Sequence, residues 1–275
     1  LWMKKSYLAT VFFLAAMLLC GCPSSQTDAH EEMIDLHSDI DWKAPDPAVS
    51  QRPKILFVGN SHTFYNHLSR IFVNIVDAMG RKSDVYELSQ GYYTLKRFSD
   101  TEDKAGIMLD QVLSKQKWEL VVLQENTSMV LSPSPEEEMY PYARALDEKI
   151  KAAGGQTAFL MTWAPKNGIK DGIRKKSMEE TQVQIAARYM AISNELDSLV
   201  IPAGAGFVRC QEAYPEIELW DNDGQHPSPE GSYLTACVIY ATIFRESPEN
   251  CSYTGDLDKE TAAKLQKVAA ELILH

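Results

Sequence analysis

The segment Lys54–Leu68, KILFVGNSHTFYNHL, sets the fold that the sequence predicts. It opens with a short apolar run of strand-forming residues, Lys54–Val58, which a Gly-Asn pair ends. Ser61 comes next, ahead of an amphipathic stretch, Phe64–Met79, that is typical of a helix. Ser61 is therefore expected at the carboxyl end of a strand and the amino end of a helix. Open α/β sheets bind ligands at that edge, and a helix dipole there stabilises negative charge.

A second segment, Trp220–Gly231 (WDNDGQHPSPEG), offers Ser61 a partner. Asp223 and His226 stand three residues apart in it, in a turn rich in glycine and proline. A carboxylate beside an imidazole can hold Nδ1–H and leave Nε2 free to act as a base. Taken separately, each segment has a simpler interpretation: Ser61 caps a helix, and His226 lies in a surface turn. Their joint presence in one α/β domain favours a serine nucleophile with a histidine base.

These segments resemble the first and fifth sequence blocks of the SGNH (GDSL-like) hydrolases, within the branch whose first block reads GNSxT. The resemblance extends over about residues 54–245. It implies that Ser61 is the nucleophile, that His226 is its base and that Asp223 orients His226. It also implies a flavodoxin-like sheet with the strand order 2-1-3-4-5 and Ser61 at the switch point between strands.

Two further blocks imply an oxyanion hole. Ser89-Gln90-Gly91 resembles the second block, whose glycine N–H joins the N–H of Ser61 in binding the oxyanion. The run QENT, which starts at Gln124, stands where the third block usually has Gly-x-Asn-Asp. Asn126 matches the family's asparagine by position and would donate a side-chain N–H. Because Gln124 replaces the usual glycine, Gln124 remains an alternative donor.

Short β-rich runs alternate with amphipathic segments of helical length from Lys54 onward. This pattern predicts a three-layer α/β/α domain over residues 54–275, with a five-stranded parallel sheet covered on both faces. The expected strands are Ile55–Val58, Asp84–Leu88, Glu119–Leu123, Ala158–Thr162 and Leu199–Pro202. The expected helices are Phe64–Met79, Lys104–Ser114, Pro141–Ala153, Met178–Glu195, Gly231–Ile243 and Lys259–Leu274.

The first 53 residues predict export and attachment to a membrane. Two lysines precede an apolar run, Tyr7–Leu19, that is too short to span a bilayer comfortably. Its Leu-x-Gly-Cys ending resembles a bacterial lipobox, which implies a signal peptide over residues 1–21 and a lipid on Cys22. A plain signal peptide or an uncut anchor is the alternative. Residues 22–53 are polar and acidic, which indicates a tether. The implied location is the bacterial cell envelope, facing the periplasm or the cell surface.

Two loops are expected to wall the cleft. Thr127–Met139 follows the third block, and Trp163–Ser177 follows the fourth strand and carries five basic residues. These basic residues could form a cationic rim for an acidic glycan or, more simply, a solvated loop. Trp163 could stack against a sugar ring or be buried, and Asn60 and His62 are further cleft candidates. His62 is not expected to be the base, because consecutive side chains point apart.

The composition argues against other classes of function. The chain has 27 basic and 38 acidic residues, so a nucleic acid backbone would be repelled. No Walker loop, G-x-G-x-x-G or G-x-S-x-G motif is present and no metal-ligand spacing stands out, so no cofactor or metal is expected. Cys237 lies in an expected apolar helix, which favours Cys210–Cys251 as a disulfide bridge. The sequence leaves the oligomeric state open.

The sequence therefore predicts a serine esterase that acts on an O-acyl ester. The family's envelope branches imply an O-acetyl or similar ester on a carbohydrate. Two alternatives remain open. The altered third block suggests a lipid-anchored glycan-binding protein with the same fold and little turnover. An acyltransferase would use the same residues, with a sugar in place of water as the acceptor.

Overall fold

Five parallel strands form the central sheet of the computed structural model, which describes residues 34–274. The strands are β1 (Lys54–Gly59), β2 (Asp84–Ser89), β3 (Leu120–Leu123), β4 (Gln156–Leu160) and β7 (Leu199–Ile201). Their order is β2-β1-β3-β4-β7, so the predicted flavodoxin-like order is confirmed, with β7 as the fifth strand. Almost all residues of β1 and β3 are buried, as expected for parallel strands covered on both faces.

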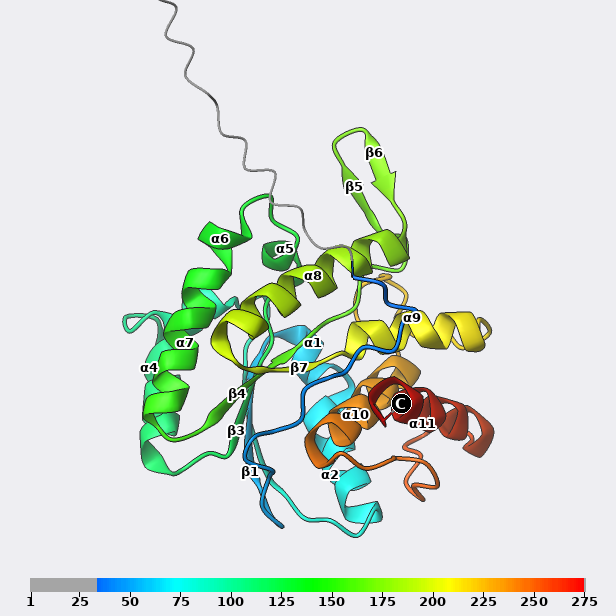
Figure 1. Cartoon of the computed structure of the whole chain (residues 1–275), viewed down its shortest axis with the longest axis horizontal. Coiled ribbons are helices and arrows are strands. Elements are labelled where there is room, and N and C mark those ends of the chain that lie inside the picture. The colour runs from blue at the N-terminus through cyan, green and yellow to red at the C-terminus, as the bar shows by residue number, and fades with distance from the viewer. Residues whose placement is uncertain (1–33, 275) are drawn as a thin grey trace, which may run out of the picture. The chain divides into compact units, whose positions relative to one another are not determined.

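Helices form the two outer layers (Figure 1). One face carries α4 (Lys104–Lys115), α7 (Tyr140–Ala152) and α8 (Met178–Leu196), and the other carries α2 (Leu68–Ala78) and α10 (Pro229–Phe244). α11 (Lys259–Leu274) packs against α10, which explains why α10 is buried on all sides and shows no polar face. Within residues 34–274, none of the helices combines the length and the apolar character needed to cross a membrane.

The helix expected over Phe64–Met79 is interrupted near its start. The chain forms α1 (Ser61–Phe64), then a 3-10 turn, η1 (Tyr65–His67), and only then α2. Asn66 and His67 have φ angles of 52° and 59°, so the backbone turns into the left-handed region that a continuous helix excludes. The amphipathic pattern alone did not reveal this break.

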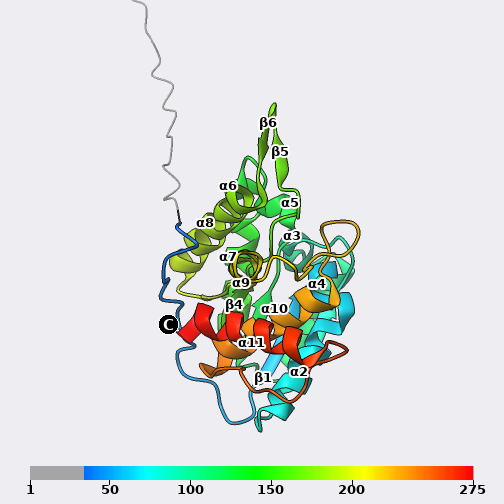
Figure 2. The same ribbon diagram turned by 90° about the vertical axis from the view of Figure 1, so that its right-hand side faces the viewer.

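Several short elements were not predicted. They are α3 (Leu95–Ser99), α5 (Thr127–Val130), α6 (Pro135–Glu138), α9 (Ala203–Ala213) and the antiparallel hairpin of β5 (Ile169–Asp171) and β6 (Arg174–Lys176). Both expected cleft loops therefore contain regular structure: α5 and α6 lie in the first, and the hairpin lies in the second. The hairpin projects beyond the helices around it (Figure 2).

Residues 34–53 differ from the expected tether. Leu36 and Trp42 are each only 2% exposed and belong to the hydrophobic core. Arg209 donates to the carbonyl of Leu36 at 3.0 Å, and Arg245 donates to the carbonyl of Trp42 at 3.0 Å. Two apolar side chains in a polar stretch are enough to dock it, so the folded unit begins before Lys54. The expected signal peptide, Cys22 and the start of the tether lie outside the described residues.

The expected bridge between Cys210 and Cys251 is absent. Both residues, and Cys237, are free and buried. Cys210 lies on α9, whereas Cys251 follows α10. Burial raises the pKa of the Cys210 thiol to about 12, so its thiolate is scarce at neutral pH.

Candidate active site

Ser61 begins α1 and is separated from the end of β1 by one residue, but it does not cap the helix. That role belongs to Asn60, whose Oδ1 accepts a hydrogen bond from the His62 N–H at 3.2 Å. The Asn60 amide also donates to the carbonyl of Tyr93 at 2.9 Å, which fixes its orientation. Because Asn60 is the cap, the Ser61 hydroxyl remains available to the cavity that both residues line.

The structure brings Ser61, His226 and Asp223 together. Ser61 Oγ lies 2.8 Å from His226 Nε2, and His226 Nδ1 lies 2.5 Å from Asp223 Oδ2. Desolvation opposes ionisation of Asp223, but hydrogen bonds from the His226 ring and from the Gln225 and His226 N–H groups outweigh it and lower the pKa of Asp223 to about 2. Asp223 is therefore ionised at neutral pH. Its charge holds a proton on Nδ1 and leaves Nε2 to accept from Ser61.

Tyr65 supports the imidazole of His226. The two rings stack with centroids 4.4 Å apart and planes inclined by 18°. The Tyr65 hydroxyl donates to Asp221 Oδ2 at 3.2 Å, which links Tyr65 to the loop that carries His226. The sequence did not mark Tyr65, because it fits the apolar pattern of the expected helix.

The loop that carries His226 is held from two directions. Trp163 Nε1 donates to the carbonyl of Gln225 at 2.9 Å. Asn66 Nδ2 donates to the carbonyl of Pro227 at 2.9 Å. The residues on both sides of His226 are thus anchored, one by the segment after β4 and one by the break before α2.

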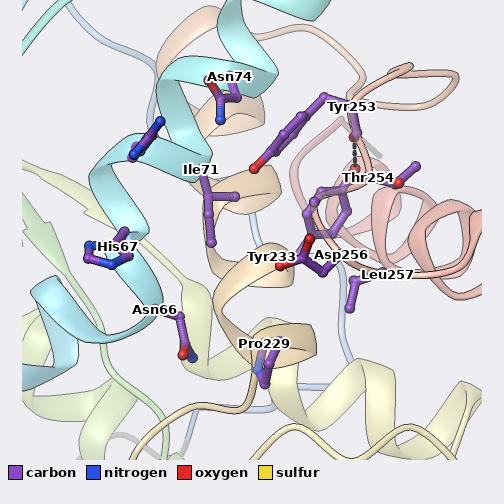
Figure 3. A pocket seen from close by; sticks show the side chains of 12 residues that line it. Asn66, His67, Ile71, Asn74, Pro229, Tyr233, Tyr253, Thr254, Asp256 and Leu257 are labelled. Atoms are coloured by element: carbon purple, nitrogen blue, oxygen red, sulfur yellow. Dashed lines mark hydrogen bonds between the residues drawn. The ribbon is translucent and has the colours of Figure 1, made fainter.

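A second cavity, of about 490 Å³, lies between the start of α2, the start of α10 and the segment after α10 (Figure 3). Its walls include Asn66 of η1, Ile71 and Asn74 of α2, and Tyr253 from the segment after α10. It shares no lining residue with the cavity that contains Ser61. The candidate catalytic chemistry therefore belongs to the other cavity.

Gln124 is fully engaged within the fold. Its side chain is buried, and its Oε1 accepts from the Asn60 N–H at 2.8 Å and from Thr63 Oγ1 at 2.9 Å. Its Nε2 donates to the carbonyl of Glu125 at 2.6 Å. A Cβ on Gly59 would collide with this same amide, which explains the glycine at the end of β1. The structure thus gives Gln124 a supporting position under the Ser61 turn.

Asn126 lines the cavity that contains Ser61. Its Oδ1 accepts from the Ser128 N–H at 3.0 Å, so it caps α5 and its Nδ2 must point elsewhere. Nδ2 has no hydrogen-bond acceptor in the part of the chain that the structure describes. Of the two amides considered from the sequence, the geometry favours Asn126 as an oxyanion donor.

Gly91 lies just outside the residues that line this cavity, whereas its neighbour Tyr92 is one of them. A Cβ on Gly91 would meet nothing within 4 Å, so packing does not require glycine there. Tyr92 has a φ of 63° and is 88% exposed. A bulky residue with positive φ is rare. The sequence did not reveal this conformation, because Tyr92 is only the first of two tyrosines after Gly91.

Glu125 connects the two segments that carry Gly91 and Asn126. Its carboxyl group is wholly buried and accepts from the Asn126 N–H at 2.6 Å and from the Leu95 N–H at 3.2 Å. Leu95 begins α3, which follows the Gly91 segment. Burial raises the pKa of Glu125 to about 8 and outweighs the two backbone hydrogen bonds, which lower it. No sequence motif pointed to this residue.

The cavity that contains Ser61 has a volume of about 640 Å³. Ile169 and Lys170 of β5 form part of its wall. Of the five basic residues expected as a cationic rim, Lys170 is among the residues that line the cavity, whereas Lys166 pairs with Glu218 and Arg174 pairs with Glu180.

Trp163 also contributes to the wall, but it is buried. Its ring stacks on Phe207 with centroids 4.5 Å apart, and His62 lies 5.2 Å away. His62 itself is neutral at neutral pH, because desolvation and the nearby His226 lower its pKa to about 4. These two cleft candidates thus support the loop of His226 rather than offering a free ring face.

No family model matches the chain, and no curated protein matches its sequence. Solved structures do match. A candidate SGNH hydrolase from Slackia heliotrinireducens is 27% identical, with a TM-score of 0.57, over 71% of this chain and 99% of that one. A DUF4886 family protein from Bacteroides uniformis is 15% identical, with a TM-score of 0.66, over 80% and 93%. An acetylxylan esterase from Geobacillus stearothermophilus is 18% identical, with a TM-score of 0.54, over 71% and 95%. The likeness to the Slackia protein, together with the strand order, shows that the chain belongs to the SGNH hydrolase superfamily.

Proposed function

We propose that this protein is a serine esterase that hydrolyses an O-acyl ester, with an O-acetyl ester on a carbohydrate as the substrate class. The observation that carries the proposal is the hydrogen-bonded chain from Ser61 Oγ through His226 to Asp223, which opens onto the cavity of about 640 Å³. A serine hydroxyl beside a base that a third group orients is the arrangement that activates a nucleophile.

In the proposed mechanism, His226 Nε2 takes the proton of Ser61 as Oγ attacks the ester carbonyl. The backbone N–H groups of Ser61 and Gly91 and the Nδ2 of Asn126 stabilise the oxyanion, each contributing about 3 kcal/mol. His226 then returns the proton to the leaving alcohol, which leaves an acyl group on Ser61. Water attacks this acyl group with the same base, and Asp223 stabilises the imidazolium in both steps. No cofactor takes part.

The carbohydrate part of the proposal has separate support. Amide and hydroxyl side chains of Asn126, Thr127, Ser128 and Gln225 line the cavity, and such groups suit the hydroxyls of a sugar. The acetylxylan esterase from Geobacillus stearothermophilus shares the fold and is consistent with this class of substrate.

Ser61→Ala tests the proposal. We expect kcat/KM for p-nitrophenyl acetate to fall by about 10⁴-fold or more, because the nucleophile is lost. Ser69→Ala is the matched control: Ser69 lies on α2, where its hydroxyl donates to Glu87, and it does not line the cavity. A fluorophosphonate should label the native protein on Ser61 and leave the Ser61→Ala variant unlabelled.

Retention of full activity by Ser61→Ala would contradict the proposed nucleophile. Binding of acetylated glycans without release of acetate would instead point to a glycan-binding protein. Transfer of the acetyl group to an added sugar, detected by mass spectrometry of the products, would identify an acyltransferase.

A further inference from the structure

Tyr92 presents an aromatic ring at the rim of the cavity that contains Ser61. It lines that cavity and is nevertheless 88% exposed. The other large hydrophobic side chains that are exposed within residues 34–274 are those of Phe64, Tyr86, Ile107, Met108 and Ile173, and none of them lines this cavity. Tyr92 is thus set apart by its place and not by exposure alone.

The backbone at Tyr92 makes this placement more unusual. Its φ of 63° lies in the left-handed region, which L residues other than asparagine, aspartate and glycine seldom adopt. The neighbouring Gly91 could take up such a turn without strain, yet the structure gives the positive φ to the tyrosine. Strained residues of this kind concentrate at ligand-binding sites, where they aim a side chain.

The ring of Tyr92 has a free face, in contrast to that of Trp163 in the same cavity wall. Trp163 has Phe207 on one side and His62 nearby, and it is 1% exposed. Tyr92 makes no aromatic pair with any described residue. An open aromatic face beside amide and hydroxyl side chains fits a sugar ring, whose C–H face packs on the aromatic ring while its hydroxyls form hydrogen bonds.

We propose that Tyr92 is the stacking platform for the sugar ring that carries the ester cleaved at Ser61. This inference rests on the proposed esterase function and deepens it. A long acyl chain is the competing occupant of the rim. It would gain little from a ring that is almost entirely open to water, because an acyl chain is stabilised by enclosure.

Two substitutions separate the ring from the backbone. Tyr92→Asn removes the ring but tolerates positive φ, whereas Tyr92→Phe keeps the ring and removes only the hydroxyl. The substrates are p-nitrophenyl acetate, p-nitrophenyl octanoate and a panel of partially acetylated xylo-, gluco-, manno- and galacturono-oligosaccharides. Tyr86→Asn is the matched control, since Tyr86 is a half-exposed tyrosine of β2 outside the cavity.

For Tyr92→Asn we expect KM for the accepted oligosaccharide to rise by about tenfold, with kcat nearly unchanged. Activity on p-nitrophenyl acetate should stay within about twofold, and Tyr92→Phe and Tyr86→Asn should behave like the native protein on all substrates. Equal losses on all esters, a loss confined to the octanoate, or no loss would each overturn the platform. The platform would also be overturned if the native protein cleaved the aryl esters and none of the oligosaccharides.

A binding measurement keeps this inference distinct from the proposed function. Calorimetry with the same oligosaccharides compares Ser61→Ala with the double variant Ser61→Ala/Tyr92→Asn. If the native protein hydrolyses nothing but the double variant binds an oligosaccharide about tenfold more weakly than Ser61→Ala does, the esterase proposal fails, and Tyr92 remains a stacking platform for the sugar ring of a bound oligosaccharide. If the native protein hydrolyses nothing and Ser61→Ala binds no member of the panel, both are overturned.

Discussion

Among single residues, Glu125 has a consequence that can be measured without a substrate. Its carboxyl group is wholly buried, and burial raises its pKa to about 8 from an ordinary value of 4.5. The N–H groups of Asn126 and Leu95 donate to the carboxyl group and offset part of the cost of burying its charge. Tyr189 of α8 is the titratable residue beside Glu125, and its hydroxyl accepts from the Glu125 N–H at 3.3 Å. The desolvated carboxylate is thus disfavoured relative to the neutral acid.

We predict that Glu125→Gln changes the pH dependence of stability. Between about pH 4.5 and 8 the folded chain holds a proton on Glu125 that the unfolded chain has lost. The stabilisation from this proton is complete at the low end of the window and is lost as pH rises through about 8. The unfolding free energy of the native protein, relative to the glutamine variant, should therefore fall by up to about 1.4 kcal/mol per pH unit.

Urea denaturation of both proteins at a series of pH values from 4 to 9 provides the measurement. A difference in unfolding free energy that is independent of pH, or that increases with pH, would contradict the assignment of a buried, proton-retaining Glu125.

The sequence could place Ser61, Asp223 and His226 in one site, because each lies in a local pattern with a chemical meaning. It could not choose between Gln124 and Asn126, since the choice depends on contacts of Gln124 with Asn60 and Thr63 more than sixty residues away. Residues that act through packing, such as Tyr65 and Glu125, have no local signature and became visible only in the fold.

At the scale of elements, the sheet was predictable and the boundaries of some helices were not. β1, β3 and β4 are short buried runs between turn residues, and their length favours a strand over a helix. α9 was missed because Gly204 and Gly206 lower the helix propensity of its first turn. A Cβ on Gly204 would collide with the carbonyl of Thr162, so the glycine serves close packing at the expense of the local signal.

The break between α1 and α2 depends on Asn66, and we predict its energetic signature. Asn66→Ala removes two hydrogen bonds, to Pro227 O and Ser232 Oγ, and leaves alanine at a φ of 52°. Each bond contributes about 1 kcal/mol, and the positive φ costs alanine about 1 kcal/mol. The unfolding free energy should therefore fall by about 3 kcal/mol.

Asn66→Gly separates the two causes. Glycine also loses both hydrogen bonds, but it accepts positive φ, so this variant should be about 1 kcal/mol more stable than Asn66→Ala. Urea denaturation measures both. If the two variants are equally stable, the backbone conformation of the break is not a source of strain. A fall in esterase kcat in both variants would link the break to the loop of His226.

For the whole molecule, the docking of residues 34–53 changes what the amino-terminal region can do. Leu36 and Trp42 fasten this segment to the folded unit, and the carbonyl bonds from Arg209 and Arg245 reinforce it. Of the expected tether, only residues 22–33 remain between Cys22 and the described structure. A stretch of that length reaches at most about 40 Å when fully extended. A lipid on Cys22 would therefore keep the domain close to a membrane surface.

We propose that the protein is such a lipoprotein of the bacterial cell envelope, and Cys22→Ser tests this. When the full chain is expressed in a bacterium, the native protein should partition with membranes and incorporate radioactive palmitate, because several acyl chains give stable attachment. Cys22→Ser should lose the label and move to the soluble fraction while keeping the native kcat/KM, since the site lies wholly within residues 60–226.

Cys210→Ser is the control, because Cys210 is buried on α9 and should not affect labelling. Incorporation of palmitate by Cys22→Ser at the native level would contradict the lipidation, and membrane retention without any label in the native protein would indicate an uncut anchor.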